Sequence, residues 1–321
     1  MRQTCLNMVY DLAKRDERVV FVGSDLSPGL LADMKRDMPE RWYMEGITEQ
    51  NLIGMSAGLA KEGYIPYSNT IATFITRRCY EQVAVDLCLH DLPVRLIANG
   101  GGLVYAPLGP THLAIEDIAI MRALPNMTVT AVCDAKEMVR LMNATLDWPH
   151  PIYIRLAKGG DPVVSRDELG FAIGKAIPMR RARSRHAAVL MSTGVMTTNS
   201  LAAAELLAKD GIDMSVVHFH TVKPLDEALV LELARTHAAL VTVEDNAIAG
   251  GAGSAVAELL AGKNLQVPLL QLGLPDAFLE HASREQLLGE AGIDAAGIRQ
   301  AILGRWPQFA QKPVVEVRSA V

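Results

Sequence analysis

Four residues of this chain have types and positions that could do chemistry. Glu49 stands at the start of a small-residue helical pattern, in EGITEQNLIGMSAGLAKEGY. Phe74 and Tyr80 lie on the next long helical pattern, and His112 ends the short sequence GPTH. A carboxylate and an imidazole can transfer protons, and aromatic faces can hold a flat ligand. If the fold gathers these residues at one edge of a sheet, they would suit a pocket.

Each of these residues also has an ordinary explanation. Glu49 could be a first-turn acid that faces the positive end of the helix dipole, behind Thr48 as the N-cap. Phe74 could be a core residue, and His112 could be a structural histidine. The functional interpretation therefore depends on whether the fold brings them together.

The elements that would position these residues alternate between strand and helix. Strands are predicted at 19–25, 64–70, 93–102, 127–134 and 151–159, and helices at 45–64, 72–91, 113–124 and 135–147. Such alternation predicts a mainly parallel sheet with helices on both faces. Ligands bind at the carboxyl ends of the strands in such sheets. The residues after the first three strands should meet at that edge.

A charged stretch interrupts the alternation, and a second unit follows it. Further strands are predicted at 187–194, 238–245 and 267–275, a strand plus a turn at 213–226, and helices at 197–209, 227–237 and 250–262. The fold class expected is α/β, with two three-layer α/β/α domains at 1–160 and 186–321 and a linker at 161–185. The basic cluster at 180–185 is interpreted as a solvated face. GGAGSAV (250–256) could bind a phosphate, but a glycine loop that packs a helix on a strand is favoured.

The composition excludes some classes of function. The 321 residues carry a formal net charge of −5, which argues against nucleic acid or an anionic membrane as the main partner. No stretch has the ~20 apolar residues of a membrane span, and the N-terminus lacks the apolar region of a signal peptide. The four cysteines form no C-x-x-C pair, and no zinc-ligand spacing is seen. We expect a cytoplasmic protein with free, mostly buried thiols.

A family resemblance rests on seven segments in order. FVGSDLSPG, EGITEQNLIGMSAGLAKEG, TIATFITRRCYEQV, GPTH, PIYIRLAKG, TVKPLD and TVEDN…GGAGSAV occur as in the C-terminal half of transketolases. The resemblance covers nearly the whole chain. It implies the pyrimidine-binding domain followed by the transketolase C-terminal domain, as in the short β-type subunit of a split transketolase. The cofactor implied is thiamin diphosphate with Mg²⁺.

The resemblance also implies roles for single residues. Glu49 would bond N1′ of the thiamin aminopyrimidine as the activating acid/base residue, and Phe74 would stack on that ring. His112 would contact the C1 hydroxyl and carbonyl region of a sugar donor. The remaining positions are the cofactor-binding Asp25, Arg77 and Tyr80 and the phosphate-binding Arg2 and Arg155, whose guanidinium groups suit an anionic tail.

Two departures from the family pattern affect the expected partners and substrates. The GDG…N motif that binds Mg²⁺ and diphosphate is absent, so a separate α subunit should supply it, in an α₂β₂ assembly. Leu108 stands where transketolases have a sugar-reading aspartate, and Gly29 and Gly100 stand where a serine and a histidine assist phosphate binding. These changes predict an unusual, still anionic, ketose donor or aldehyde acceptor.

Three functions remain open from the sequence. The favoured one is the β subunit of a transketolase that moves a two-carbon ketol unit from a ketose to an aldose. The second is the β subunit of a 2-oxo-acid dehydrogenase or a deoxyxylulose-phosphate-synthase-like enzyme; GPTH and the YEQV helix favour transketolase over the dehydrogenase. The third is a non-catalytic scaffold paralogue, which would have no need of Glu49, Phe74 and His112 together.

Overall fold

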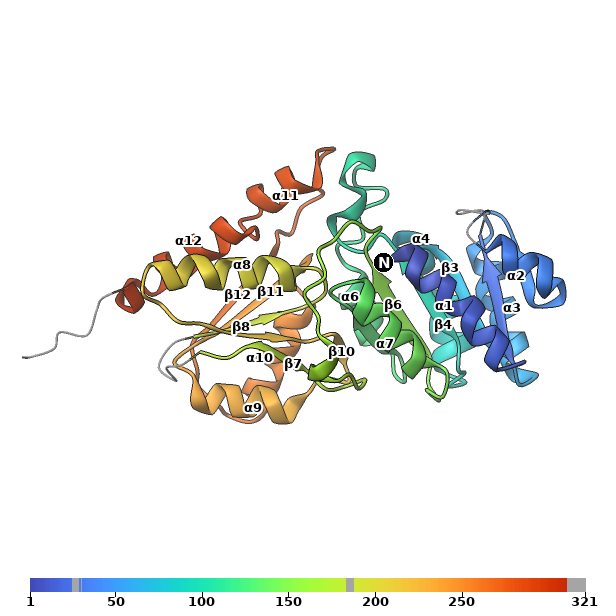
Figure 1. The fold of residues 1–321 in the computed structure, drawn as a ribbon, viewed down its shortest axis with the longest axis horizontal. Coiled ribbons are helices and arrows are strands. Elements are labelled where there is room, and N and C mark those ends of the chain that lie inside the picture. The colour runs from blue at the N-terminus through green and yellow to red at the C-terminus, as the bar shows by residue number, and fades with distance from the viewer. Residues whose placement is uncertain (25–28, 30, 183–187, 311–321) are drawn as a thin grey trace, which may run out of the picture.

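The computed structural model describes residues 1–24, 29, 31–182 and 188–310 as two α/β units side by side (Figure 1). The first unit is a seven-stranded sheet in the order β10-β5-β6-β4-β3-β1-β2. Its strands are β1 (Val19–Gly23), β2 (Trp42–Met44), β3 (Ile65–Ile71), β4 (Arg95–Asn99), β5 (Thr128–Ala131), β6 (Ile152–Leu156) and β10 (Thr221–Lys223). All neighbours pair in parallel except β10 with β5.

Helices flank this sheet, as the alternation predicted. They are α1 (Arg2–Arg15), α2 (Ala32–Asp37), α3 (Glu49–Lys61), α4 (Ala72–Thr76), α5 (Tyr80–Gln82), α6 (Asp117–Ala123) and α7 (Ala135–Thr145). Strands β1, β4 and β6 are buried along their whole length. Burial on both faces is the property that makes parallel strands read as continuous apolar runs.

The second unit has a five-stranded sheet in the order β12-β11-β8-β9-β7. Its strands are β7 (Ile177–Arg180), β8 (Val189–Ser192), β9 (Ser215–His218), β11 (Leu240–Ala247) and β12 (Leu269–Leu274). Its helices are α8 (Met196–Lys209), α9 (Glu227–Thr236), α10 (Ala252–Gly262), α11 (Arg284–Glu290) and α12 (Ala295–Arg305). The fold class expected from the sequence, two α/β domains, is confirmed.

Two strands cross the division that the sequence suggested. β7 lies within the stretch 161–185 that was expected to be a linker, yet it pairs antiparallel with β9. β10 comes from the second half of the chain but adds an antiparallel strand to β5 of the first sheet. The two units are therefore interlocked through the backbone.

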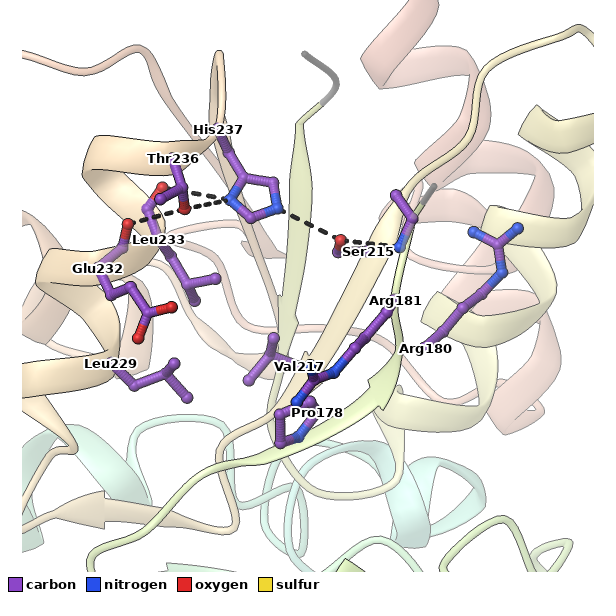
Figure 2. Close-up of a pocket in the computed structure, with 11 residues that line it drawn as sticks. Pro178, Arg180, Arg181, Ser215, Val217, Leu229, Glu232, Leu233, Thr236 and His237 are labelled. Carbon is purple, nitrogen blue, oxygen red and sulfur yellow. Dashed lines mark hydrogen bonds between the residues drawn. The ribbon is translucent and has the colours of Figure 1, made fainter. Parts of the chain in front are cut away.

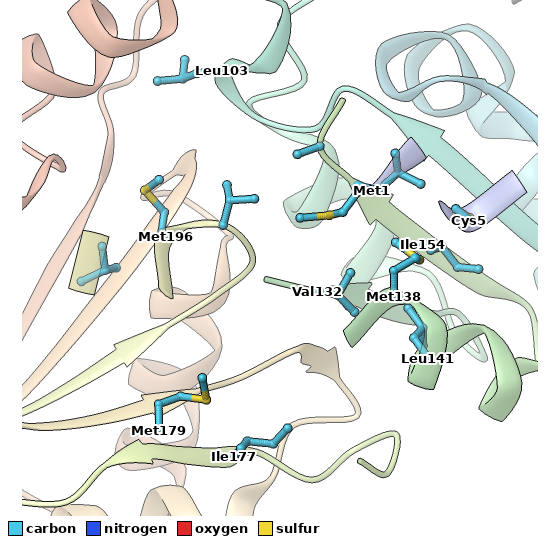
Figure 3. Close-up of a cluster of buried hydrophobic side chains, with 14 of the residues drawn as sticks. Met1, Cys5, Leu103, Val132, Met138, Leu141, Ile154, Ile177, Met179 and Met196 are labelled. Carbon is cyan, nitrogen blue, oxygen red and sulfur yellow. The ribbon is translucent and has the colours of Figure 1, made fainter. Parts of the chain in front are cut away.

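One apolar core runs across the junction of the two units. Figure 3 shows Val132 and Ile154 of the first unit together with Ile177 and Met196 of the second in the same cluster of buried side chains. Continuous burial of this kind couples the units, because separating them would expose apolar surface to water. Within the described residues, no helix is both long and apolar enough to span a membrane.

The helix predicted at 72–91 is broken into several kinds of turn. Between α4 and α5 a 3₁₀ turn spans Arg77–Cys79, and α5 continues as a π-helix over Val83–Cys88. Such changes of helical winding are frequent at functional sites.

Candidate active site

Glu49 is the first residue of α3, and its side chain is only 2% exposed. Thr48 occupies the N-cap position, but its hydroxyl does not cap the helix and instead donates a hydrogen bond to the Glu45 carbonyl, at 2.7 Å. A first-turn acid that merely complements the helix dipole has no need to be buried, because the dipole also stabilises an exposed carboxylate. The burial of Glu49 therefore calls for specific partners.

Those partners approach the carboxylate from two sides. Thr70, on β3, donates its hydroxyl to Oε1 at 3.3 Å, and Ser24, directly after β1, donates in turn to the Thr70 hydroxyl at 2.9 Å. Nη1 of Arg78 lies 2.7 Å from Oε2. The carboxyl ends of β1 and β3 thus position the carboxylate at the edge of the sheet where a ligand is expected.

Arg78, the ion-pair partner of this carboxylate, also lines a surface pocket of about 540 Å³. The Phe74 ring meets the His112 ring edge-on, with centroids 5.3 Å apart, and the Arg78 guanidinium carbon lies 4.1 Å from the Phe74 centroid. The pocket is lined by Thr73, Phe74, Arg77, Arg78, Thr111 and His112. The structure therefore brings Phe74, Arg77 and His112 together, and Glu49 is linked to them through Arg78.

His112 is held by its neighbours in the GPTH turn. Its backbone N–H donates to the Gly109 carbonyl at 3.0 Å, and its Nδ1 lies 2.9 Å from the Thr111 hydroxyl. Partial burial lowers the pKa of His112, and the nearby charges of Arg77 and Arg78 lower it further. The imidazole is thus kept neutral near pH 7, in a form that can donate or accept a hydrogen bond.

Arg77 is anchored toward the GPTH turn rather than toward Glu49. Its Nε lies 2.9 Å from a Glu116 carboxylate oxygen, and its Nη2 donates to the Leu113 carbonyl at 3.0 Å. Sequence reasoning assigned a role to Arg77 but missed Arg78. The two arginines are adjacent in the same 3₁₀ turn, yet Arg77 pairs with Glu116 and Arg78 pairs with Glu49.

Other predicted site residues lie apart from the pocket lining. The Tyr80 hydroxyl donates to the Ile120 carbonyl at 2.8 Å. Arg2 begins α1, and Leu108 is a 48% exposed residue just before Gly109. Asp25 falls outside the described residues. For these four positions the assigned roles stay predictions.

Arg155 lies at the junction of the two units. Its side chain is only 4% exposed and pairs with Asp117 at 2.8 Å and with Asp245 at 2.5 Å, and its expected phosphate-binding role stays a prediction. Burial alone would lower the pKa of Arg155, yet the charges of the two aspartates outweigh it and raise the pKa. Because Asp245 comes from the second unit, Arg155 fastens the two units together instead of facing the pocket.

Two glycines that replace polar family residues have different surroundings. Gly100 has a φ of +80°, and a Cβ there would lie 2.1 Å from the Tyr105 ring. No side chain fits at Gly100 unless Tyr105 moves. The histidine expected here from the family pattern could therefore not be accommodated by this backbone as it stands. At Gly29 nothing lies within 4 Å of the place of a Cβ.

The glycine-rich segment at 250–256 holds a carboxylate of the protein itself. Glu244 accepts hydrogen bonds from the backbone N–H groups of Ala252 and Gly253, both at 2.8 Å. A Cβ on Gly251 would lie 2.2 Å from the same carboxylate. This loop therefore packs α10 against β11, and its helix N-terminus is already occupied by Glu244.

Two further features of the described residues lie away from the pocket. Figure 2 shows a pocket of about 390 Å³ in the second unit, where His237 reaches across to the Ser215 hydroxyl at 3.3 Å. The sequence showed no metal-ligand spacing, yet Cys133, Glu137 and His218 meet as buried potential ligands. Glu137 Oε2 already takes hydrogen bonds from the Cys133 N–H and from His218 Nε2, at 2.7 and 2.9 Å, so we interpret this group as a link between the units.

Comparison with known families agrees with both units of the fold. Residues 1–160 match the family of the transketolase pyrimidine-binding domain, and residues 178–298 match the family of the transketolase C-terminal domain. Similar curated proteins are the 1-deoxy-D-xylulose-5-phosphate synthases of Thioalkalivibrio sulfidiphilus, 41% identical over 92% of this chain, and Xylella fastidiosa, 38% identical over 94%. This chain covers 45% and 46% of those relatives, so it spans about half of their length.

Solved structures give a second comparison. A chain described as a split gene transketolase, inactive beta4 tetramer, is 32% identical with a TM-score of 0.86, and the match covers 94% of this chain and 97% of that one. The transketolase of Campylobacter jejuni matches at 20% identity with a TM-score of 0.76, over 94% of this chain and 46% of its own, which supports the fold. The protein described here belongs to the transketolase family.

Proposed function

We propose that this chain is the β subunit of a two-subunit, thiamin-diphosphate-dependent enzyme that transfers a two-carbon ketol unit from an anionic ketose to an aldehyde. The observation that carries the proposal is the buried Glu49 carboxylate, which Arg78 links to a pocket lined by Phe74 and His112. We further propose that the enzyme works in the cytoplasm, for which the four free, buried cysteines are the support.

The residues present fit the pyrimidine half of thiamin diphosphate. A carboxylate that is almost fully buried, with a hydroxyl chain behind one oxygen, can share a proton with a ring nitrogen in a dry environment. Phe74 offers an aromatic face to the pocket. When bound, the cofactor supplies a nucleophilic carbon for cleaving the carbon–carbon bond beside a ketone.

This chain's own residues would then do three things. Glu49 would hold and move a proton at a ring nitrogen, and Phe74 would fix the plane of the ring by stacking. His112, kept neutral by burial and by two arginines, would donate a hydrogen bond to a substrate oxygen where negative charge develops.

The diphosphate and Mg²⁺ are proposed to be bound by a separate α subunit, in an α₂β₂ assembly. The support is that a split gene transketolase chain matches over nearly its whole length. In addition, the one group of three potential metal ligands found among the described residues is the Cys133 group at the junction of the units, away from the pocket. A shared site between chains is a common outcome of symmetric assembly.

A second candidate function is favoured by the curated relatives. Proteins 37–41% identical to this chain carry the name 1-deoxy-D-xylulose-5-phosphate synthase. Under this alternative the donor would be a 2-oxo acid such as pyruvate rather than a ketose. Leu108, in place of a sugar-reading aspartate, is compatible with a donor that has fewer hydroxyl groups.

The test is a donor screen with the assembled enzyme. The chain is mixed with a separately encoded subunit that carries the GDG…N motif, and each donor is supplied with thiamin diphosphate, Mg²⁺ and an aldose phosphate. Ketol transfer from ketose phosphates, without release of CO₂, is the expected result. Turnover of pyruvate with release of CO₂ would replace the proposal by the synthase alternative, and no turnover of any donor would favour a scaffold.

A further inference from the structure

Arg78 contacts both of the groups that the proposed function assigns to the cofactor ring. Its Nη1 lies 2.7 Å from Oε2 of Glu49, and its guanidinium carbon lies 4.1 Å from the centroid of the Phe74 ring. The Arg78 side chain also lines the pocket and is 41% exposed. It therefore lies at the mouth of the site, between the carboxylate and the aromatic face.

We propose that Arg78 acts as a latch that closes the pyrimidine half-site of the unloaded chain, by placing its guanidinium on Glu49 and Phe74 until the cofactor displaces it. The proposal rests on the proposed function. A guanidinium is flat, delocalised and rich in N–H donors, and it stacks on aromatic rings. These are the properties by which a protonated aminopyrimidine would satisfy the same carboxylate and the same ring, so the two groups compete.

The ion pair also places on Glu49 a group that cannot share a proton with it. A guanidinium stays protonated in proteins, so it cannot exchange a proton with the carboxylate. While Arg78 is in place, its Nη1 occupies Oε2 of Glu49. Withdrawal of Arg78 would free the carboxylate for a ring nitrogen. Binding of the cofactor would therefore also make Glu49 available for proton transfer.

The surroundings of Arg78 allow such a withdrawal. Its exposure contrasts with that of Arg155, which is 4% exposed and paired with two buried aspartates. Arg78 leaves its place by rotating into solvent, where its charge is hydrated. It also sits in the 3₁₀ turn between α4 and α5, where helical winding changes.

The first test uses the free chain without cofactor. The Tm of thermal unfolding is measured for the wild type, for Glu49→Gln, for Arg78→Gln and for the double variant, which together form a double-mutant cycle. The latch predicts coupling, so that the second substitution changes the Tm much less than it does alone. Additive effects would show that the two side chains do not interact in solution and would overturn the proposal.

The second test measures binding of thiamin diphosphate with Mg²⁺ to the complete assembly by calorimetry. Arg78→Gln should tighten binding about threefold to tenfold, because removal of a competing group raises the fraction of open sites. Arg77→Gln removes the same charge from the same turn but leaves the Glu49 pair, so it should not tighten binding. Unchanged or weaker binding by the Arg78 variant would mean that Arg78 supports the cofactor instead of excluding it, and would overturn the latch.

Failure of the proposed function gives a different pattern. In that case the wild-type assembly binds no thiamin diphosphate, although coupling between Glu49 and Arg78 is still found in the free chain. The pair would then be a structural ion pair, and both the latch proposal and the cofactor assignment would be wrong. Coupling together with selective tightening by Arg78→Gln supports both.

Discussion

Replacing Glu49 by glutamine should lower the turnover of the assembled enzyme by about 10²- to 10⁴-fold, the usual contribution of a positioned acid/base group. Glutamine keeps the size of the side chain and can still accept the hydrogen bond from Thr70. It cannot take up or release a proton at a ring nitrogen. The loss should therefore appear in kcat when cofactor is saturating. Steady-state kinetics with the donor found in the screen provides the measurement.

A substitution outside the pocket controls for unspecific effects. Ser56→Ala removes a buried hydroxyl from the same helix, which bonds to the Leu52 carbonyl and to Ser68, and should leave kcat within a fewfold of wild type. The Glu49 variant should keep its circular dichroism spectrum and its binding to the α subunit. Turnover equal to wild type would remove Glu49 from the mechanism.

Replacing Arg155 by methionine should destabilise the chain by about 3–5 kcal/mol, the usual cost of removing one partner from a buried ion pair. Methionine preserves much of the volume but leaves Asp117 and Asp245 as buried carboxylates, each 1% exposed. It also removes hydrogen bonds to the carbonyls of Ala114 and Asp245. Denaturant unfolding followed by circular dichroism measures the change in the free energy of unfolding.

A more exposed ion pair across the same junction is the matched control. Arg122 pairs with Glu258 at 2.5 Å, with the two side chains 18% and 63% exposed. Arg122→Met should cost only about 1 kcal/mol, because water screens the pair and hydrates the carboxylate that is left. If Arg155→Met cost no more than Arg122→Met, then Arg155 would not fasten the units.

Much of the fold could be predicted because its signals are local. β1 is a continuous apolar run and β6 is apolar except for Arg155, and both proved to be buried parallel strands. α7 begins where Asp134 accepts the N–H groups of Lys136 and Glu137, a capping pattern that is visible in the sequence. The alternation of strands and helices then predicts that ligands bind at the carboxyl ends of the parallel strands.

The features that escaped prediction depend on distant partners. β10 is a three-residue strand whose place in the first sheet is fixed by pairing with β5, some 90 residues earlier. The role expected for Arg155 came from the family resemblance, and its pairing with aspartates that lie 38 and 90 residues away in the chain could not be seen in the sequence. Arg78 gave no signal of its own, since its partner Glu49 is 29 residues away and the helix pattern around it continues without a visible break.

We propose that this chain forms the pyrimidine half of a thiamin diphosphate site and that the diphosphate half lies on another subunit. Calorimetric titration of thiamin diphosphate with Mg²⁺ tests it most directly, with the chain alone and with the chain mixed with the GDG…N-bearing subunit. We expect tight binding only in the mixture, and loss of a proton-linked part of the binding heat with Glu49→Gln. Tight binding to the chain alone, or no binding in the mixture, would contradict it.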